Sequence, residues 1–96
     1  MDKKQELKKL IKKSNLEEID KDKWGVIIDS LPENAIEAFL EIFEKFPEEI
    51  SWFNENYKKK EKASALLEEN REMGQKALSE IYQEEAEKMQ SLMNAQ

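Results

Sequence analysis

The apolar residues of this chain are concentrated in one stretch, SLPENAIEAFLEIFEKFPEEISWF, residues 30–53. Between its two prolines they recur at helical spacing and cover an arc about 160° wide on an ideal helix. They are Ile36, Phe39, Leu40, Phe43 and Phe46, flanked by Ala35 and Ile42. Proline is tolerated at the first position of a helix, so Pro32 and Pro47 each predict a helix start. So wide a stripe predicts that helix 32–46 is the central element of a bundle, packed between the Trp24 helix and the start of the last helix.

Two weaker helical patterns precede that stretch. Residues 2–13 have a narrow apolar edge, which predicts a helix docked on the bundle. That edge consists of Leu7, Leu10 and Ile11. The segment DKWGVIIDSL also has apolar residues at helical spacing, although Gly25 disfavours a helix there. These residues are Trp24, Ile27, Ile28 and Leu31. We predict a helix rather than a strand, because the chain has no second apolar run of strand length that could pair with it.

Polar residues between these two segments suggest where the second helix starts. Ser14 and Glu17 have the spacing of a capping box, in which each side chain satisfies the other residue's free backbone N–H. Asp20 or Asp22 is the candidate N-cap of the segment that contains Trp24. The residues between Ser14 and Asp20 would then form a short helical stub.

The last part of the chain has few helix-breaking residues. From Glu48 to about Met93 there is no proline, one glycine and no cluster of turn residues. The pattern predicts a single helix of about 68 Å. Because residues 58–62 offer nothing apolar, we expect a compact bundle over 1–57 and an extended helix over 58–96. Gly74 leaves an alternative, in which the helix bends or ends there and 75–93 folds back as a hairpin.

An apolar stripe follows this predicted helix beyond the bundle. Its period is close to 3.67 residues per turn, which favours a nearly straight association over a heptad zipper. A continuous helix would leave the stripe without a partner inside the chain, and soluble monomers seldom expose so much apolar surface. We therefore expect another helix to cover it, with the small residues at the closest approach. The candidate protein-interaction residues are Leu67, Gly74, Ala77, Leu78, Ile81, Met89 and Leu92.

Composition supports a single all-α domain. Charged residues make up 40% of the 96 residues and the net charge is −6. This charge is unevenly distributed, at +4 over residues 1–13, −9 over 14–57 and −1 over 58–96. A basic arm and an acidic body attract each other, so we expect the N-terminal lysines to contact acids of the same protein rather than nucleic acid.

The residue types exclude several kinds of chemistry. The chain has no cysteine and no histidine, which rules out thiol catalysis and thiolate or imidazole metal sites. Its acidic clusters lack the spacing of a calcium loop or a di-iron bundle. We predict no enzyme, no metal, no cofactor and no small-molecule substrate. A small domain without disulfides indicates the cytoplasm, and neither a signal peptide nor a membrane span is expected.

These observations favour a small acidic protein-interaction or oligomerisation module that acts through its C-terminal helix. Its partner would be a second copy of the chain or another helical protein. Two alternatives remain. One is a nucleic-acid-associated factor that uses the lysine clusters, with Lys58, Lys59 and Lys60 beside aromatic residues. The other is an inhibitor of the kind that phages encode, whose acidic bundle competes for a basic site on its target.

Overall fold

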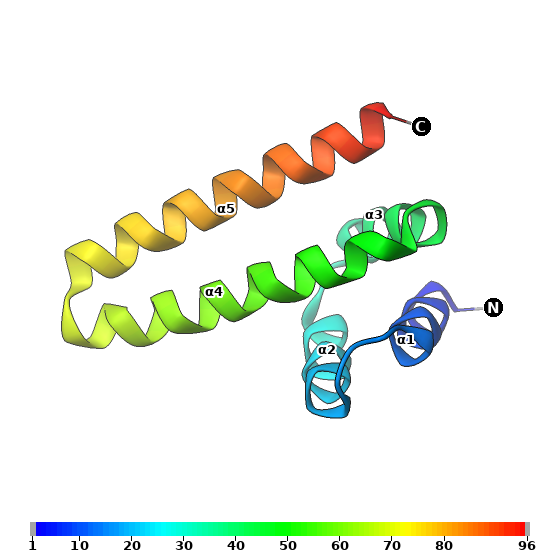
Figure 1. Cartoon of the computed structure of the whole chain (residues 1–96), viewed down its shortest axis with the longest axis horizontal. Helices are drawn as coiled ribbons and strands as arrows, with labels where there is room; N and C mark the ends of the chain where they lie inside the picture. The colour runs from blue at the N-terminus through cyan, green and yellow to red at the C-terminus, as the bar shows by residue number, and fades with distance from the viewer. Residues whose placement is uncertain (1, 96) are drawn as a thin grey trace. The chain divides into compact units, whose positions relative to one another are not determined.

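The computed structural model describes residues 2–95, and within them it is all-α, as predicted (Figure 1). The helices are α1 (Lys3–Lys13), α2 (Glu18–Ser30), α3 (Glu33–Lys45), the 3₁₀ turn η1 (Pro47–Glu49), α4 (Ile50–Glu69) and α5 (Arg71–Asn94). No strand occurs among the described residues. The chain divides into two compact units, Met1–Ser51 and Trp52–Gln96.

The N-terminal unit is built around the wide apolar stripe of α3. Ile36, Phe39, Leu40, Ile42 and Phe43 are all buried. Trp24 of α2 packs edge-on against Phe39 and Phe43, with 6.0 Å between ring centroids in each case. Edge-to-face packing is a favourable geometry for aromatic rings. The predicted packing of α3 against the Trp24 helix is therefore confirmed.

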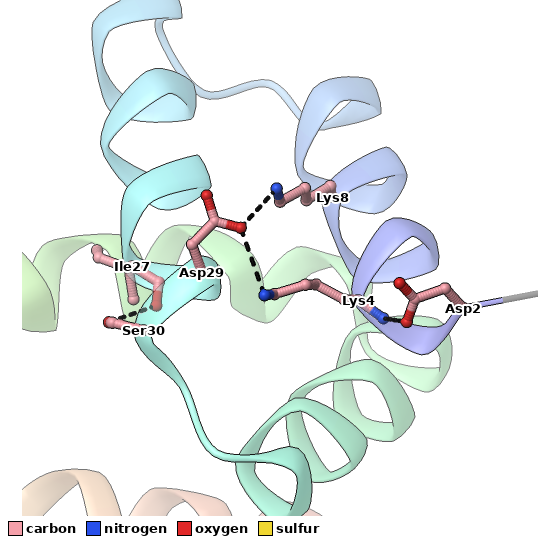
Figure 2. Close-up of polar contacts among 6 residues, drawn as sticks. All are labelled: Asp2, Lys4, Lys8, Ile27, Asp29 and Ser30. Atoms are coloured by element: carbon pink, nitrogen blue, oxygen red, sulfur yellow. Dashed lines mark hydrogen bonds and ion pairs between the residues drawn. The ribbon is translucent and has the colours of Figure 1, made fainter.

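Helix α1 docks through the apolar edge that the sequence predicts, with Leu7 and Ile11 fully buried. Its first turn is capped by Asp2, whose Oδ1 accepts a hydrogen bond from the Lys4 backbone N–H. Figure 2 shows how α1 is tied to α2 by ion pairs. The Nζ atoms of Lys8 and Lys4 lie 2.7 Å and 3.6 Å from Oδ1 of Asp29. The hydrogen bond from Lys8 is the main cause that lowers the pKa of the Asp29 carboxyl.

A third ion pair joins α1 to α3, with Lys3 Nζ 3.1 Å from Glu37 Oε1. Exposed pairs of this kind contribute little to stability individually. Together they pair the basic arm with acids of the same unit. The predicted contact between N-terminal lysines and the acidic body is thus present within the chain.

The predicted caps between α1 and α2 are wrong. Ser14 ends α1 instead of starting a helix, because its hydroxyl donates to the Ile11 carbonyl at 2.6 Å. Helix α2 begins at Glu18, so Asp20 and Asp22 lie inside it rather than before it. The N-cap of α2 is Glu17, whose side chain makes no capping hydrogen bond. The usual N-cap residues, Ser, Thr, Asp and Asn, therefore do not mark the start of this helix.

The C-terminal unit corrects the prediction of one continuous helix. Helices α4 and α5 run side by side in opposite directions, as Figure 1 shows, and form a hairpin. A single residue, Asn70, separates them in extended conformation, with φ −148° and ψ 100°. Its side chain caps α5 by accepting a hydrogen bond from the Met73 N–H at 3.1 Å. The reversal therefore lies four residues before Gly74, the position at which the sequence suggested a bend.

Gly74 is nevertheless essential to the hairpin geometry. A Cβ atom placed on it would lie 2.7 Å from both the Cα and the backbone N of Leu67. Carbon atoms in ordinary contact are about 3.5–4.0 Å apart. Only glycine lets α5 approach the backbone of α4 so closely. The sequence correctly indicated a close helix approach at Gly74, but the approaching helix belongs to the same chain.

Candidate protein-interaction site

A charged pair lies within the α4–α5 hairpin. Lys60 Nζ of α4 is 2.8 Å from Glu85 Oε2 of α5, and the two side chains are only 12% and 16% exposed. The same Nζ lies 4.2 Å from the ring centroid of Tyr57 and 4.6 Å from that of Tyr82. Cation–π attraction therefore adds to the ion pair. A pair held in this way sets the register of the two helices, since removing one partner would leave a poorly solvated charge.

A buried amide lies one helical turn before Lys60. Asn56 is 2% exposed, and its Nδ2 donates to the Ile81 carbonyl at the long distance of 3.5 Å. Its Oδ1 has no hydrogen-bond partner among the described residues. An unsatisfied buried acceptor costs free energy, so this asparagine weakens the apolar interface in which it lies. Such residues are known to specify helix pairing at the expense of stability.

Tyr57 is the titratable group of the hairpin with the most altered environment. Burial raises the pKa of its hydroxyl to about 12, with smaller contributions from the Glu85 carboxylate and from Tyr82. The tyrosine is therefore neutral at physiological pH. This environment fits a structural role beside Lys60 rather than a role in proton transfer, which is best served by a pKa near the working pH.

The predicted interaction stripe lies within the hairpin, with Leu67 on α4 and its other six residues on α5. Of its seven residues, Gly74, Ile81 and Leu92 are buried, and Leu67, Ala77, Leu78 and Met89 are partly buried. The premise that the stripe has no partner within the chain is therefore wrong. It rested on a continuous helix, and the reversal at Asn70 brings residues 50–69 against residues 71–94 instead. Whether these residues also bind a second protein stays a prediction.

Another side of α5 is exposed and carries no charge. Residues alternating at steps of four and three along this side form what we call the outer row. It consists of Gln75, Ser79, Tyr82, Ala86, Met89 and Met93. Met89 is partly buried and the other five are exposed, including Tyr82 at 55% and Met93 at 42%. Alternating steps of four and three are the spacing of a coiled-coil seam.

The lysine clusters are largely paired with acids. In α4, Lys58 and Lys59 lie 3.7 Å and 3.6 Å from carboxylate oxygens of Glu55 and Glu84. The aromatic residues next to them are also engaged. Phe53 is fully buried, and the Trp52 ring lies 5.3 Å below Lys88 Nζ. These residues do not form the open aromatic and basic surface that single-stranded nucleic acids prefer.

Residues 2–95 hold no cluster of acidic side chains that could bind a metal ion. Nor is any helix in that range long and apolar enough to cross a membrane. The N-terminal unit has a surface hollow between the α1–α2 link and η1, lined by Leu10, Leu16, Pro47 and Ile50 among others. Its only ionisable side chains, Lys13 and Glu48, are both exposed. The hollow therefore lacks the partly dry setting that general acid–base chemistry needs.

Comparisons with protein-family models, curated proteins and solved structures gave no match for this chain.

Two features of the hairpin were missed by our reading of the sequence. The outer row could have been found from its steps of four and three and from the lack of charge, which is unusual where 40% of residues are charged. Asn70 could have been recognised as a cap, since asparagine is among the preferred N-cap residues and Glu72 follows in the first turn.

Proposed function

We propose that this chain is a non-enzymatic helical protein-interaction module, and that the outer row of α5 binds an amphipathic helix of another protein. The observation that supports the proposal is that the residues of this row are uncharged, mostly exposed and spaced as in a heptad repeat. A row with this period matches another helix over several turns. Tyrosine and methionine are enriched at protein interfaces, since both offer large adaptable contact area.

Charge complementarity indicates the kind of helix. Helix α5 carries five acidic and three basic residues, a net charge of −2, whereas the outer row itself carries none. A helix with an apolar seam and basic flanks would be attracted by the overall negative potential and would bring no charge onto the row. The same proposal places the chain in the cytoplasm, as its composition without cysteine led us to expect.

The other candidate functions lack a supporting observation of this kind. Nucleic-acid binding requires lysines that are open to phosphate, yet Lys4, Lys8, Lys59 and Lys60 each lie within 4 Å of a carboxylate oxygen. Inhibition of a target with a basic site would require a defined acidic surface. The acids Asp29 and Glu37 are already partly neutralised by α1.

A helix-display experiment tests the proposal. The probe is a library of displayed 24-residue amphipathic helices, with apolar heptad positions fixed and all other positions random. Selected binders should carry an excess of lysine and arginine on their flanks. Their affinity should fall at least tenfold, the equivalent of about 1.4 kcal/mol, for Tyr82→Glu with Met93→Glu.

Val26→Glu is the matched control, since Val26 is a 72% exposed apolar residue on α2 of the other unit. It introduces a glutamate at an exposed apolar position outside the outer row and should leave binding unchanged. Binders that are insensitive to the Tyr82 and Met93 changes would contradict the proposal. If the wild type self-associates and the Tyr82 and Met93 changes abolish that association, the partner on the outer row is a second copy of the chain.

A further inference from the structure

The connection between α4 and α5 is a single residue. From Ile50 to Asn94 every residue except Asn70 is helical. The segment also contains no proline, and its one glycine, Gly74, lies inside α5. A change in the backbone conformation of Asn70 would therefore be enough to join the two helices into one.

Straightening at Asn70 would satisfy additional backbone groups. The first N–H groups of a helix have no partner within it. In α5 the side chain of Asn70 supplies one such partner, for Met73. In a continuous helix the N–H groups of residues 71–73 would instead donate to the carbonyls of residues 67–69. The joined helix loses the side-chain cap and gains ordinary helical hydrogen bonds.

The hairpin contacts all join a residue before Asn70 to a residue after it. Lys60 pairs with Glu85, Lys59 pairs with Glu84, and Asn56 donates to the Ile81 carbonyl. The contact between Leu67 and Gly74 lies nearest the turn. In each pair the earlier residue lies on α4 and the later one on α5. Two straightened helices, associated antiparallel about a two-fold axis near residue 70, would therefore form every one of these contacts twice, between chains.

We infer that two copies of this chain can dimerise by exchanging α5, with Asn70 as the hinge. Domain swapping is a low-cost route to dimers, and short connections favour it. The partner in this association is a second copy of the chain, and the surface is the inner face of the hairpin rather than the outer row. The inference therefore stands independently of the proposed function.

Because the contacts are the same in both forms, concentration and the hinge decide between them. A short connection gives the intramolecular contact an effective concentration in the millimolar range. We expect the wild type to be monomeric at micromolar concentration and increasingly dimeric toward about 1 mM. Asn70→Ala removes the cap and favours a continuous helix, so it should lower the concentration of half-dimerisation by about tenfold or more.

Charge reversal distinguishes exchange from any other dimer. Lys60→Glu and Glu85→Lys each place two like charges in the hairpin. In an exchanged dimer of the two variants, however, both pairs have opposite charges. One is the native pair of Lys60 with Glu85, and the other has the two charges reversed. After joint unfolding and refolding, an equimolar mixture with one variant ¹⁵N-labelled should yield predominantly heterodimer by native mass spectrometry. Each variant alone should yield much less dimer.

Two controls keep the result interpretable. The double variant with Lys60→Glu and Glu85→Lys in one chain restores opposite charges within the hairpin and should behave as wild type. Insertion of Gly-Ser-Gly after Asn70 relaxes the turn and breaks helix continuity, so this variant should stay monomeric up to about 1 mM. The reference is a mixture of labelled and unlabelled wild-type chains, in which mixed dimers form by chance. The inference is overturned if the mixture of the two variants gives no larger fraction of heterodimer than this reference. It is also overturned if Asn70→Ala remains monomeric throughout.

The outer row provides a separate readout. Gln75→Glu with Met93→Glu should leave the exchange dimer intact, since both residues are exposed and neither belongs to the predicted interaction stripe. Loss of dimer in this variant would mean that the outer row is the interface, and the exchange inference would be wrong.

Discussion

Gly25 and Gly74 both lie in helices, yet a methyl group would meet different surroundings at the two positions. At Gly25 nothing lies within 4 Å of the added Cβ, whereas at Gly74 the backbone of Leu67 is 2.7 Å away. Alanine is favoured over glycine in a helix by about 0.8–1.0 kcal/mol. At Gly74 the clash is with main-chain atoms, which cannot move aside as a flexible side chain would. Packing therefore requires glycine at position 74 but not at position 25.

We predict that Gly25→Ala raises the free energy of unfolding by about 0.5–1 kcal/mol and that Gly74→Ala lowers it by about 1–3 kcal/mol. Urea unfolding of both variants, followed by circular dichroism at 222 nm, measures the two changes. Each variant serves as the other's control, because the change in helix propensity is the same. A Gly74→Ala variant as stable as Gly25→Ala would show that α4 and α5 do not approach so closely.

At the scale of helices, the structure follows the sequence where burial determines the pattern. Helix α3 was predictable because its apolar arc is too wide for any solvent-exposed helix. Phe39 and Phe43 lie at the centre of that arc, and both are buried. Helix α1 was also predictable from a buried apolar pattern, although a narrower one. Leu7 and Ile11 of its apolar edge are both buried.

The reversal at Asn70 was not predictable from helix propensity alone, because residues 50–94 contain no proline and a single glycine, which itself lies inside α5. What ends α4 is a combination of the Asn70 cap and the packing of Gly74 on Leu67, and the second is visible only in three dimensions. The residues of the interaction stripe were recognised correctly as an apolar face. Their partner was misassigned, since the pattern does not show whether the covering helix belongs to the same chain.

Tyr57 links the stability of the hairpin to pH. Its pKa in the folded chain is raised to about 12, above the value near 10 of an exposed tyrosine. Folding therefore favours the protonated hydroxyl, and this contribution is fully present below about pH 10 and lost as the pH rises toward 12. Lys60 Nζ lies over the Tyr57 ring, and the Glu85 carboxylate and Tyr82 raise the pKa of Tyr57 further.

Comparison with Tyr57→Phe isolates that contribution. Because Tyr57 is partly exposed and solvent screens it, we expect the wild type to lose about 1 kcal/mol relative to Tyr57→Phe between about pH 9 and pH 11.5. Guanidinium unfolding across this range measures the difference. Tyr82→Phe is the control and should show a smaller change, since Tyr82 is more exposed. A difference between wild type and Tyr57→Phe that does not vary with pH would contradict the prediction.

At the scale of the whole chain, the distribution of charge decides which macromolecules can approach. The net charge of −6 repels polyanions, and the basic segment 1–13 is partly neutralised by acids of the same unit. Lys3 pairs with Glu37, while Lys4 and Lys8 share Asp29. A phosphate backbone would have to displace these carboxylates before it gained the same lysines. Internal pairing of this kind lowers affinity for nucleic acid even where lysines are numerous.

We therefore predict that a labelled 20-nucleotide single strand does not bind the wild type at micromolar concentration in about 0.15 M salt. Replacing the carboxylates that pair with these lysines by neutral amides should make the lysines available to phosphate. The variant Asp29→Asn, Glu37→Gln, Glu84→Gln removes three exposed acids that form ion pairs, at little cost in stability. It should bind measurably at about 50 mM salt, and counterion release should weaken that binding steeply by about 200 mM. Fluorescence anisotropy titrations of both proteins provide the measurement. Micromolar binding by the wild type that is lost on Lys58→Glu, Lys59→Glu, Lys60→Glu would instead favour a nucleic-acid function.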